Sequence, residues 1–142
     1  MQVPTAPILV GLLFDFPQAD GGASFEEAVR LGLDEVADAG RLDRPVEFET
    51  RLARGLPLGT EHDVTAAFGE LDDAGVVLII GPSISDNGLI AAPLADSARI
   101  PCINYTGGER TRAEYMFHYQ IGSLEEEPPL LARRLAQRGR DP

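Results

Sequence analysis

The sequence predicts an α/β domain, a three-layer α-β-α sandwich built on an open, mostly parallel sheet. Strand-type and helix-type segments alternate along the chain, and this order is typical of a sheet with helices on both faces. Two strand segments, 8–14 and 76–80, are almost wholly apolar, as expected for strands that are covered on both sides. The 142 residues match one domain, so we expect residues 1–142 to form a single unit.

The first strand and helix are predicted by segments 8–14 and 24–40. The apolar run 8–14 is followed by a loop, 15–23, rich in Gly, Asp and Pro. Ser24, with a glutamate three residues later, has the pattern of a capping box, which predicts a helix start. This helix keeps Phe25, Val29, Leu33 and Val36 on one face and is expected to end near Gly40.

A second strand and helix follow. Segment 45–50 alternates polar and apolar residues, which favours a strand near the sheet edge with one less buried face. Thr60 and Asp63 form a second capping pattern, and the apolar positions after them recur at helical spacing. Gly75 stands where a glycine commonly ends a helix.

The second half begins with the apolar run 76–80, a Gly-Pro turn, and a helix expected over 86–98 in which Pro93 should introduce a kink. Short strands are expected at 99–104 and 115–119, with a turn at 105–108. Ser123 and Glu126 form a third capping pattern that predicts a last helix. The leucines expected to be buried in that helix are Leu130, Leu131 and Leu135.

Composition excludes several functional classes. The net charge of −11 argues against nucleic acid as a partner, because phosphates are bound by clustered basic residues. All 12 basic residues are arginines, so neither a phosphate-loop lysine nor a Schiff-base lysine exists. One cysteine and two distant histidines lack metal-ligand spacing, and we expect Cys102 to be buried as a small apolar residue. No catalytic constellation is visible, so neither an enzyme nor a cofactor is predicted.

Ligands of open α/β sheets gather at the carboxyl ends of the strands, where strand order reverses. The loops expected there are 15–23, 83–87 and 104–108. The segment 83–87 brings Ser83 and Ser85 to a helix N-terminus, where unpaired N–H groups favour an anion. These serines also suit a purely structural role as helix caps. The two interpretations are compatible.

These segments resemble the type I periplasmic binding proteins, and the nearest branch is the branched-chain amino acid and amide binding family of ABC importers. The resemblance rests on Gly-Pro-Ser-Ile-Ser at 81–85, a helix containing Pro93, a proline-led strand at 100–104 and the aromatic strand Tyr-Met-Phe-His at 115–118. It covers roughly residues 8–139 and implies only the first lobe of a two-lobed protein, since family members are more than twice this length.

The resemblance also implies a ligand site. The ligand's carboxylate and amino group would be held by Ser85 and Ser83 after the central strand, and by Asn104, Thr106 and Gly107 in the next turn. Asp15, Phe16 and Asp20 would reach the ligand from the first loop. This chain departs from the family in the turn Asn-Tyr-Thr-Gly-Gly at 104–108, where Tyr105 is bulky. An amide or an aromatic acid therefore suits the site as well as an amino acid does.

We therefore expect a solute-binding protein of an ABC-type importer, with a small organic ligand and a membrane permease as partners, located in the periplasm or at the cell surface. The N-terminus shows no signal peptide. A ligand-sensing domain of the same fold is the alternative. A response-regulator receiver is disfavoured, because Gly81 ends the central strand and no lysine is present. The face that an absent second lobe would cover is expected to favour self-association.

Overall fold

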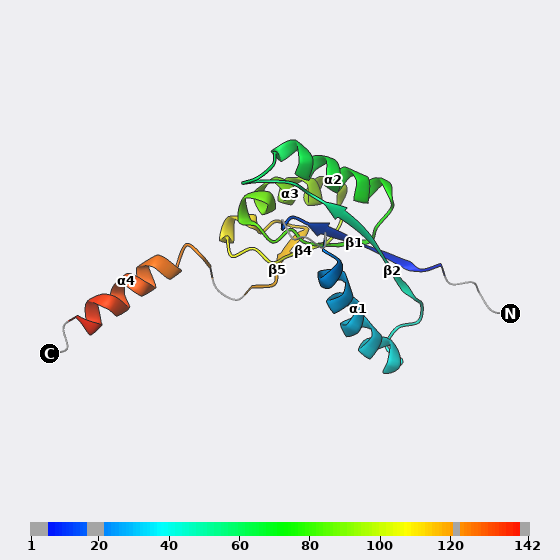
Figure 1. The fold of residues 1–142 in the computed structure, drawn as a ribbon, viewed down its shortest axis with the longest axis horizontal. Helices are drawn as coiled ribbons and strands as arrows, with labels where there is room; N and C mark the ends of the chain where they lie inside the picture. The colour runs from blue at the N-terminus through cyan, green and yellow to red at the C-terminus, as the bar shows by residue number, and fades with distance from the viewer. Residues whose placement is uncertain (1–5, 17–21, 121–122, 140–142) are drawn as a thin grey trace.

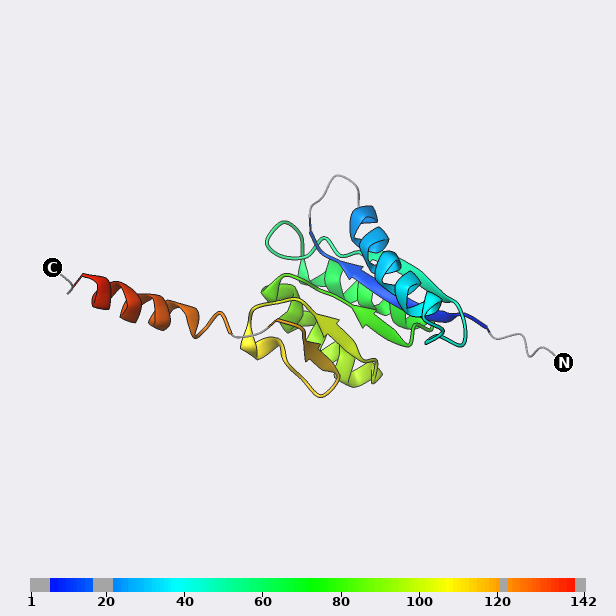
Figure 2. The ribbon, with the colours of Figure 1, turned by 90° about the horizontal axis from the view of Figure 1, so that it is seen from below.

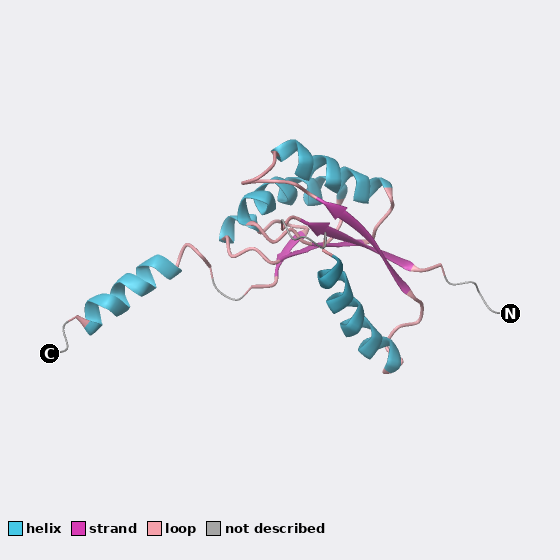
Figure 3. Ribbon diagram, in the orientation of Figure 1, coloured by secondary structure: helices cyan, strands magenta, loops and turns pink. Residues whose placement is uncertain are grey.

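The computed structural model describes residues 6–16, 22–120 and 123–139. These residues form strands and helices in alternation (Figures 1 and 3), as the sequence predicts. The elements are, in order, β1 (Ile8–Phe14), α1 (Ala23–Asp38), β2 (Val46–Leu52), α2 (Glu61–Asp73), β3 (Leu78–Ile80), α3 (Ser85–Ala98), β4 (Cys102–Asn104), the 3-10 turn η1 (Glu109–Thr111), β5 (Met116–His118) and α4 (Glu127–Arg138).

The sheet has five strands in the order β2-β1-β3-β4-β5, and every neighbouring pair is parallel. The predicted edge strand is β2, which indeed lies at one edge. Helix α1 covers one face of the sheet, and α2 and α3 cover the other (Figure 1). The predicted three-layer arrangement is therefore confirmed. Strand order reverses between β1 and β3, so the carboxyl ends of these two strands mark the place where ligands of such sheets bind.

The main core lies between the sheet and the α2–α3 layer. Inward residues of three adjacent strands, Leu13, Ile79 and Cys102, are almost fully buried there. The two helices supply the other wall through Val64, Phe68, Leu71, Ala91 and Ala95. Small alanines on α3 let that helix lie close to the sheet, so the core is narrow and closely packed.

Cys102 is fully buried, as predicted, and burial raises the pKa of its thiol to about 12. At pH 8 the folded protein should therefore resist a thiol-specific disulfide reagent, whereas the urea-unfolded chain should react with one equivalent. The unfolded thiol loses its proton above about pH 8.5, so the contribution of Cys102 to stability is present below that pH and lost as pH rises towards 12. Equal reaction rates with and without urea would contradict this prediction.

The helix-start predictions had mixed outcomes. Helix α2 begins as predicted, because Thr60 and Asp63 form a reciprocal capping box, and Gly75 follows its end with φ +77°. Helix α1 begins earlier than predicted. Gly22 is its N-cap residue, in a left-handed conformation, so Ser24 lies inside the first turn. The backbone at Gly22 passes so close to the Phe14 ring that a side chain there would clash.

The prediction for the last helix was wrong in two respects. Helix α4 begins at Glu127, and the Ser123 hydroxyl donates to the Glu125 carboxylate at 2.9 Å instead of capping it. Leu130, Leu131 and Leu135 were predicted to be buried, yet they are 54%, 62% and 68% exposed. Helical spacing identifies an apolar face but does not say whether a surface exists to cover it. Among the described residues, no helix is long and apolar enough to cross a membrane.

Candidate ligand-binding site

The carboxyl edge of the sheet brings together the ends of β1, β3 and β4, as predicted. The chain leaves β1 at Asp15, leaves β3 through Gly81 and Pro82, and leaves β4 through Tyr105. The turn after β3 is tied to that after β4 by a backbone hydrogen bond from Tyr105 N to Pro82 O, 3.1 Å long. The three turns therefore form one continuous edge at the place where strand order reverses.

The N-terminus of α3 binds a carboxylate of the chain itself. Asp15 Oδ1 accepts a hydrogen bond from Ser83 N (2.9 Å), and Asp15 Oδ2 accepts one from Ile84 N (2.8 Å). Asp15 is only 7% exposed. The N-cap residue of α3 is Ile84, and its side chain makes no capping hydrogen bond. Asp15 therefore supplies the hydrogen-bond acceptor at this helix start that was expected from Ser83 or Ser85. The N–H groups of Ser83 and Ile84, just before the first residue of α3, are thus already bound to Asp15.

Asn87 joins this carboxylate to a third loop. Its Nδ2 donates to Asp15 Oδ2 (3.0 Å) and to Leu56 O (3.2 Å), and its Oδ1 accepts from Leu56 N (2.8 Å). The side chain is fully buried. A Cβ on Gly55 would overlap the Asn87 amide, so this position admits no side chain. Asn87 was not predicted as a site residue, because an asparagine in a first helical turn does not reveal a partner 31 residues away.

A second buried network lies under the turn after β4. Thr106 Oγ1 hydrogen-bonds to Asn104 Oδ1 (3.1 Å) and to His118 Nε2 (3.1 Å), while Asn104 Nδ2 donates to Thr111 O (3.2 Å). Asn104 and Thr106 are fully buried and Thr111 nearly so. The two predicted ligand residues in this group therefore make their hydrogen bonds within the chain. In the structure, these hydrogen bonds hold the turn after β4 in shape.

Two serines and a glycine turn remain accessible at this edge. Within the described ranges, the hydroxyls of Ser83 and Ser85 make no hydrogen bond, and both residues are partly exposed. The Ser85 hydroxyl faces Gly108, where an added Cβ would lie 3.2 Å from Ser85 Oγ. Gly107 is also partly exposed. Ser85 and the partly exposed Gly107 backbone thus offer donors to a ligand from two neighbouring turns, while Gly108 is buried. Asp20 lies outside the described residues.

Aromatic rings extend from this edge along the α1 side of the sheet. Neighbouring ring centroids are 6.1 Å apart for Phe14–Phe25, 5.9 Å for Phe25–Tyr105 and 5.4 Å for Tyr105–Tyr119. Phe16 contacts Phe14 at 6.4 Å and is 47% exposed. Burial, followed by the neighbouring Tyr119, raises the pKa of Tyr105. These rings form an apolar, aromatic surface beside the carboxyl edge of the sheet.

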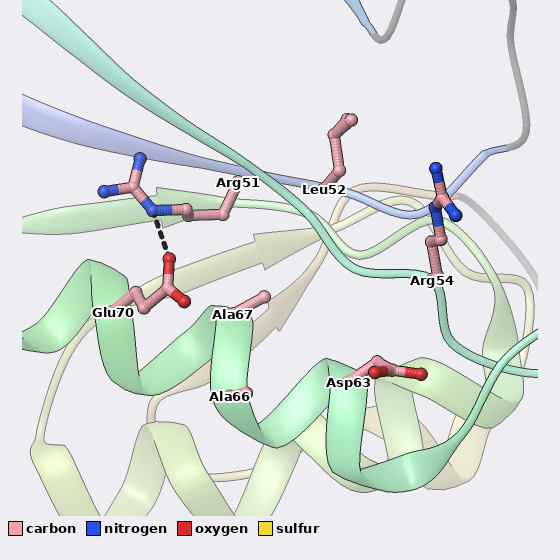
Figure 4. Close-up of a pocket in the computed structure, with 7 residues that line it drawn as sticks. All are labelled: Arg51, Leu52, Arg54, Asp63, Ala66, Ala67 and Glu70. Atoms are coloured by element: carbon pink, nitrogen blue, oxygen red, sulfur yellow. Dashed lines mark hydrogen bonds and ion pairs between the residues drawn. The ribbon is translucent and has the colours of Figure 1, made fainter.

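Two surface pockets lie elsewhere. One, of about 220 Å³, lies between β2 and α2 (Figure 4), and there Arg51 Nε binds Glu70 Oε2 at 2.7 Å. The other, of about 240 Å³, lies between α1 and β2. Both are smaller than the roughly 300–1,000 Å³ of typical ligand pockets, and Arg51 is already paired with Glu49 and Glu70. Within the described residues, no three His, Cys, Asp or Glu side chains are placed to hold a metal.

No family model and no curated protein matches the chain, but solved structures do. A substrate-binding protein from Desulfitobacterium hafniense in complex with Leu aligns at TM-score 0.73 and 21% identity, over 94% of this chain and 40% of that one. The branched-chain amino acid transporter substrate-binding protein LivJ from Streptococcus pneumoniae, in complex with isoleucine, aligns at TM-score 0.66 and 19% identity, over 82% and 34%.

A solute-binding protein from Rhodopseudomonas palustris in complex with 3,4-dihydroxybenzoic acid aligns at TM-score 0.64 and 24% identity, over 82% of this chain and 32% of that one. The chain thus spans about a third to two fifths of the length of the proteins it matches. Identities this low show the fold, which is that of the N-terminal lobe of a type I periplasmic binding protein.

Proposed function

We propose that this chain is one lobe of a solute-binding protein, and that its carboxyl edge forms one wall of a cleft for a small organic acid. The observation that carries the proposal is the accessible Ser85 hydroxyl facing Gly108 at the strand-order reversal, in a fold shared with proteins solved with leucine, isoleucine and a benzoate. Hydroxyl and backbone N–H donors from two turns suit a carboxylate, and charge-assisted hydrogen bonds of this kind are about twice as strong as neutral ones.

Within this proposal the predicted site residues have different tasks. Ser85, Ser83 and Gly107 contact the ligand, and Phe16 packs against its apolar part. Asp15, Asn104 and Thr106 act mainly by holding the turns, since their polar atoms bind the chain's own groups. Asp20 remains a candidate from the sequence alone. The ligand class is an amino acid, an amide or an aromatic acid.

The remaining contacts would come from a second lobe, which closes the cleft on the ligand and presents the closed form to a membrane permease outside the cytoplasm. The surface pockets beside β2 have no part in this proposal. A single lobe supplies only one side of the contacts and cannot exclude water, so the chain alone should bind with a dissociation constant on the order of millimolar or weaker.

The test is a titration of the ¹⁵N-labelled chain, followed by the NMR shifts of its amide groups, with L-leucine and with 4-hydroxybenzoate as separate probes. We expect saturable shifts at Ser85, Gly107 and Gly108 with at least one probe. Ser85→Ala should weaken that binding about tenfold or more, because a hydrogen bond to a charged group contributes about 1.5–3 kcal/mol.

Ser97→Ala is the matched control, since Ser97 is an exposed serine at the far end of the same helix. It should leave the titration unchanged. The proposal fails if the shifts occur away from the carboxyl edge, or if the two variants behave alike. Micromolar binding by the chain alone would contradict the claim that half of the site is missing.

A further inference from the structure

Aromatic side chains gather at the carboxyl end of the sheet, on the side where α1 lies. The chain has six phenylalanines and three tyrosines. Five of them form what we name the aromatic row, defined as Phe14, Phe16, Phe25, Tyr105 and Tyr119, and none of these five belongs to the main core. Figure 2 shows the end of β1, the start of α1 and the turn after β4 at the same end of the sheet. The row therefore joins segments that lie far apart in the sequence.

The rings of the aromatic row pack on one another in the geometry that aromatic pairs prefer. Favourable pairs have ring centroids about 4.5–7 Å apart and are offset or edge-to-face. The Phe25 and Tyr105 rings meet at 88°, and those of Tyr105 and Tyr119 meet at 57° with centroids 5.4 Å apart. Phe25 and Tyr105 are partly exposed. The row therefore offers the same edge-to-face contacts to a further ring.

The aromatic row and the proposed hydrogen-bond donors belong to the same turns. Tyr105 stands two residues before Gly107, and its N–H donates to a carbonyl oxygen of the turn before Ser85, at 3.1 Å. Phe16 directly follows Asp15, whose carboxylate binds two N–H groups of that same turn. Rings and donors are thus held beside each other at one edge of the sheet.

We propose, on the basis of the function proposed above, that the ligand of this site is an aromatic carboxylate and that Tyr105 determines this specificity. The carboxylate binds the Ser85 hydroxyl and the Gly107 backbone, while the ring packs against Tyr105 as a further member of the aromatic row. Because Tyr105 and Gly107 belong to one turn, the site suits a ligand whose ring lies close to its carboxylate, such as a benzoate.

The aromatic row distinguishes a ring from an aliphatic group of the same size by electrostatics. Burial against the row removes apolar surface from water in either case, so it strengthens the binding of both. An aromatic ligand adds an edge-to-face or offset contact, which strengthens its binding by about two- to tenfold beyond burial. The specificity is therefore a ratio of two affinities, which can be measured even when both are weak.

The test compares benzoate with cyclohexanecarboxylate, two probes that have the same charge and ring size and differ in aromaticity. Each is titrated into the ¹⁵N-labelled full chain, and the NMR shifts of the amide groups give its dissociation constant. We expect both probes to shift Ser85 and Gly107, and the dissociation constant of benzoate to be about two- to tenfold lower. This comparison uses the unaltered chain, so it does not depend on the folding of any variant.

Two substitutions of Tyr105 isolate the effect of its ring. Tyr105→Phe keeps the ring and should keep the ratio of affinities, whereas Tyr105→Leu should bring the ratio close to one by weakening benzoate alone. Phe48→Leu is the matched control. Phe48 lies under Arg30 of α1, with 4.8 Å from the guanidinium carbon to the ring centroid, and lines the pocket between α1 and β2. This control should leave the ratio unchanged.

The possible results separate this inference from the proposed function. Equal affinities at Ser85 and Gly107, tighter binding of cyclohexanecarboxylate, or L-leucine shifts at this edge with none from benzoate would overturn the aromatic specificity and leave the solute-binding role intact. Benzoate shifts confined to Arg30 and Phe48 would also overturn it, and a ratio unchanged in Tyr105→Leu would exclude Tyr105 as its cause. If neither these probes nor L-leucine shift the carboxyl edge, both proposals fail.

Discussion

Replacing Asp15 by alanine is expected to lower the free energy of unfolding by about 3–5 kcal/mol. The carboxylate accepts hydrogen bonds from Ser83 N, Ile84 N and Asn87 Nδ2, and the residue is 7% exposed. Removing it leaves three donors without this acceptor in a poorly hydrated place. Hydrogen bonds to charged groups make a net contribution of about 1.5–3 kcal/mol each, and we expect the three losses to be less than additive because the donors share one carboxylate. Urea denaturation followed by circular dichroism measures the effect.

Two variants make this result specific. Asp86→Ala removes an exposed carboxylate from the first turn of the same helix, and it should cost less than about 1 kcal/mol. In a cycle with Asn87→Ala, the two losses should be less than additive by about 1 kcal/mol or more, because the residues share a hydrogen bond. An Asp15→Ala variant as stable as Asp86→Ala would show that water replaces the carboxylate.

Replacing Gly81 by alanine is expected to cost about 3–5 kcal/mol or to prevent folding. Gly81 has φ +115°, and a Cβ there would overlap the carbonyl oxygen of Leu13. Such a backbone conformation costs a residue with a side chain about 1–3 kcal/mol. The overlap of the added Cβ with β1 adds further strain, because closely packed groups cannot move apart freely. The midpoint of thermal unfolding and the yield of folded protein report the loss.

Gly69→Ala is the matched control for this substitution. Gly69 lies inside α2, and an added Cβ would meet nothing within 4 Å. The change should stabilise the protein by about 0.5–1 kcal/mol, because glycine is the less favourable residue in a helix interior. If both glycine variants shifted stability in the same direction, the positive φ of Gly81 would not be the cause.

Both predictions concern the same part of the molecule, and they bear on ligand binding. Gly81 lets β3 turn sharply beside β1, and Asp15 then binds the N–H groups of Ser83 and Ile84 just before α3. In the proposed function, a ligand carboxylate would therefore meet Ser85 and Gly107 instead of the N–H groups that Asp15 already binds. The internal carboxylate thus sets which donors face the proposed cleft.

The order and type of the elements could be predicted from the sequence because their signals are local. The apolar run ending at Ile80, the capping pair Thr60 and Asp63, and the alternation in β2 each act within a few residues. The parallel sheet follows from their alternation. The predicted start of α1 was wrong because the N-cap is Gly22, whose backbone lies against the Phe14 ring of the preceding strand.

The position of the carboxyl edge was predictable, but the hydrogen bonds within it were not. Loop order located the carboxyl edge, and serines near a helix start pointed to Ser83 and Ser85. The internal hydrogen bonds of Asp15, Asn104 and Thr106 were not predictable, because side chains that bind a ligand and side chains that bind a nearby turn have the same chemistry. Only position distinguishes them.

The sequence by itself determined the α/β class, the order of its strands and helices, and the absence of lysine, and it proposed the carboxyl edge as the candidate ligand site. The tertiary structure decided that Asp15 binds the N–H groups just before α3, that Asn87 joins Asp15 to the loop at Leu56, and that Leu130, Leu131 and Leu135 of α4 are exposed. The physical reason is range: propensity and capping act between near neighbours, whereas these hydrogen bonds join groups 31 to 72 residues apart, and the exposure of a helix face depends on which surfaces meet in the fold.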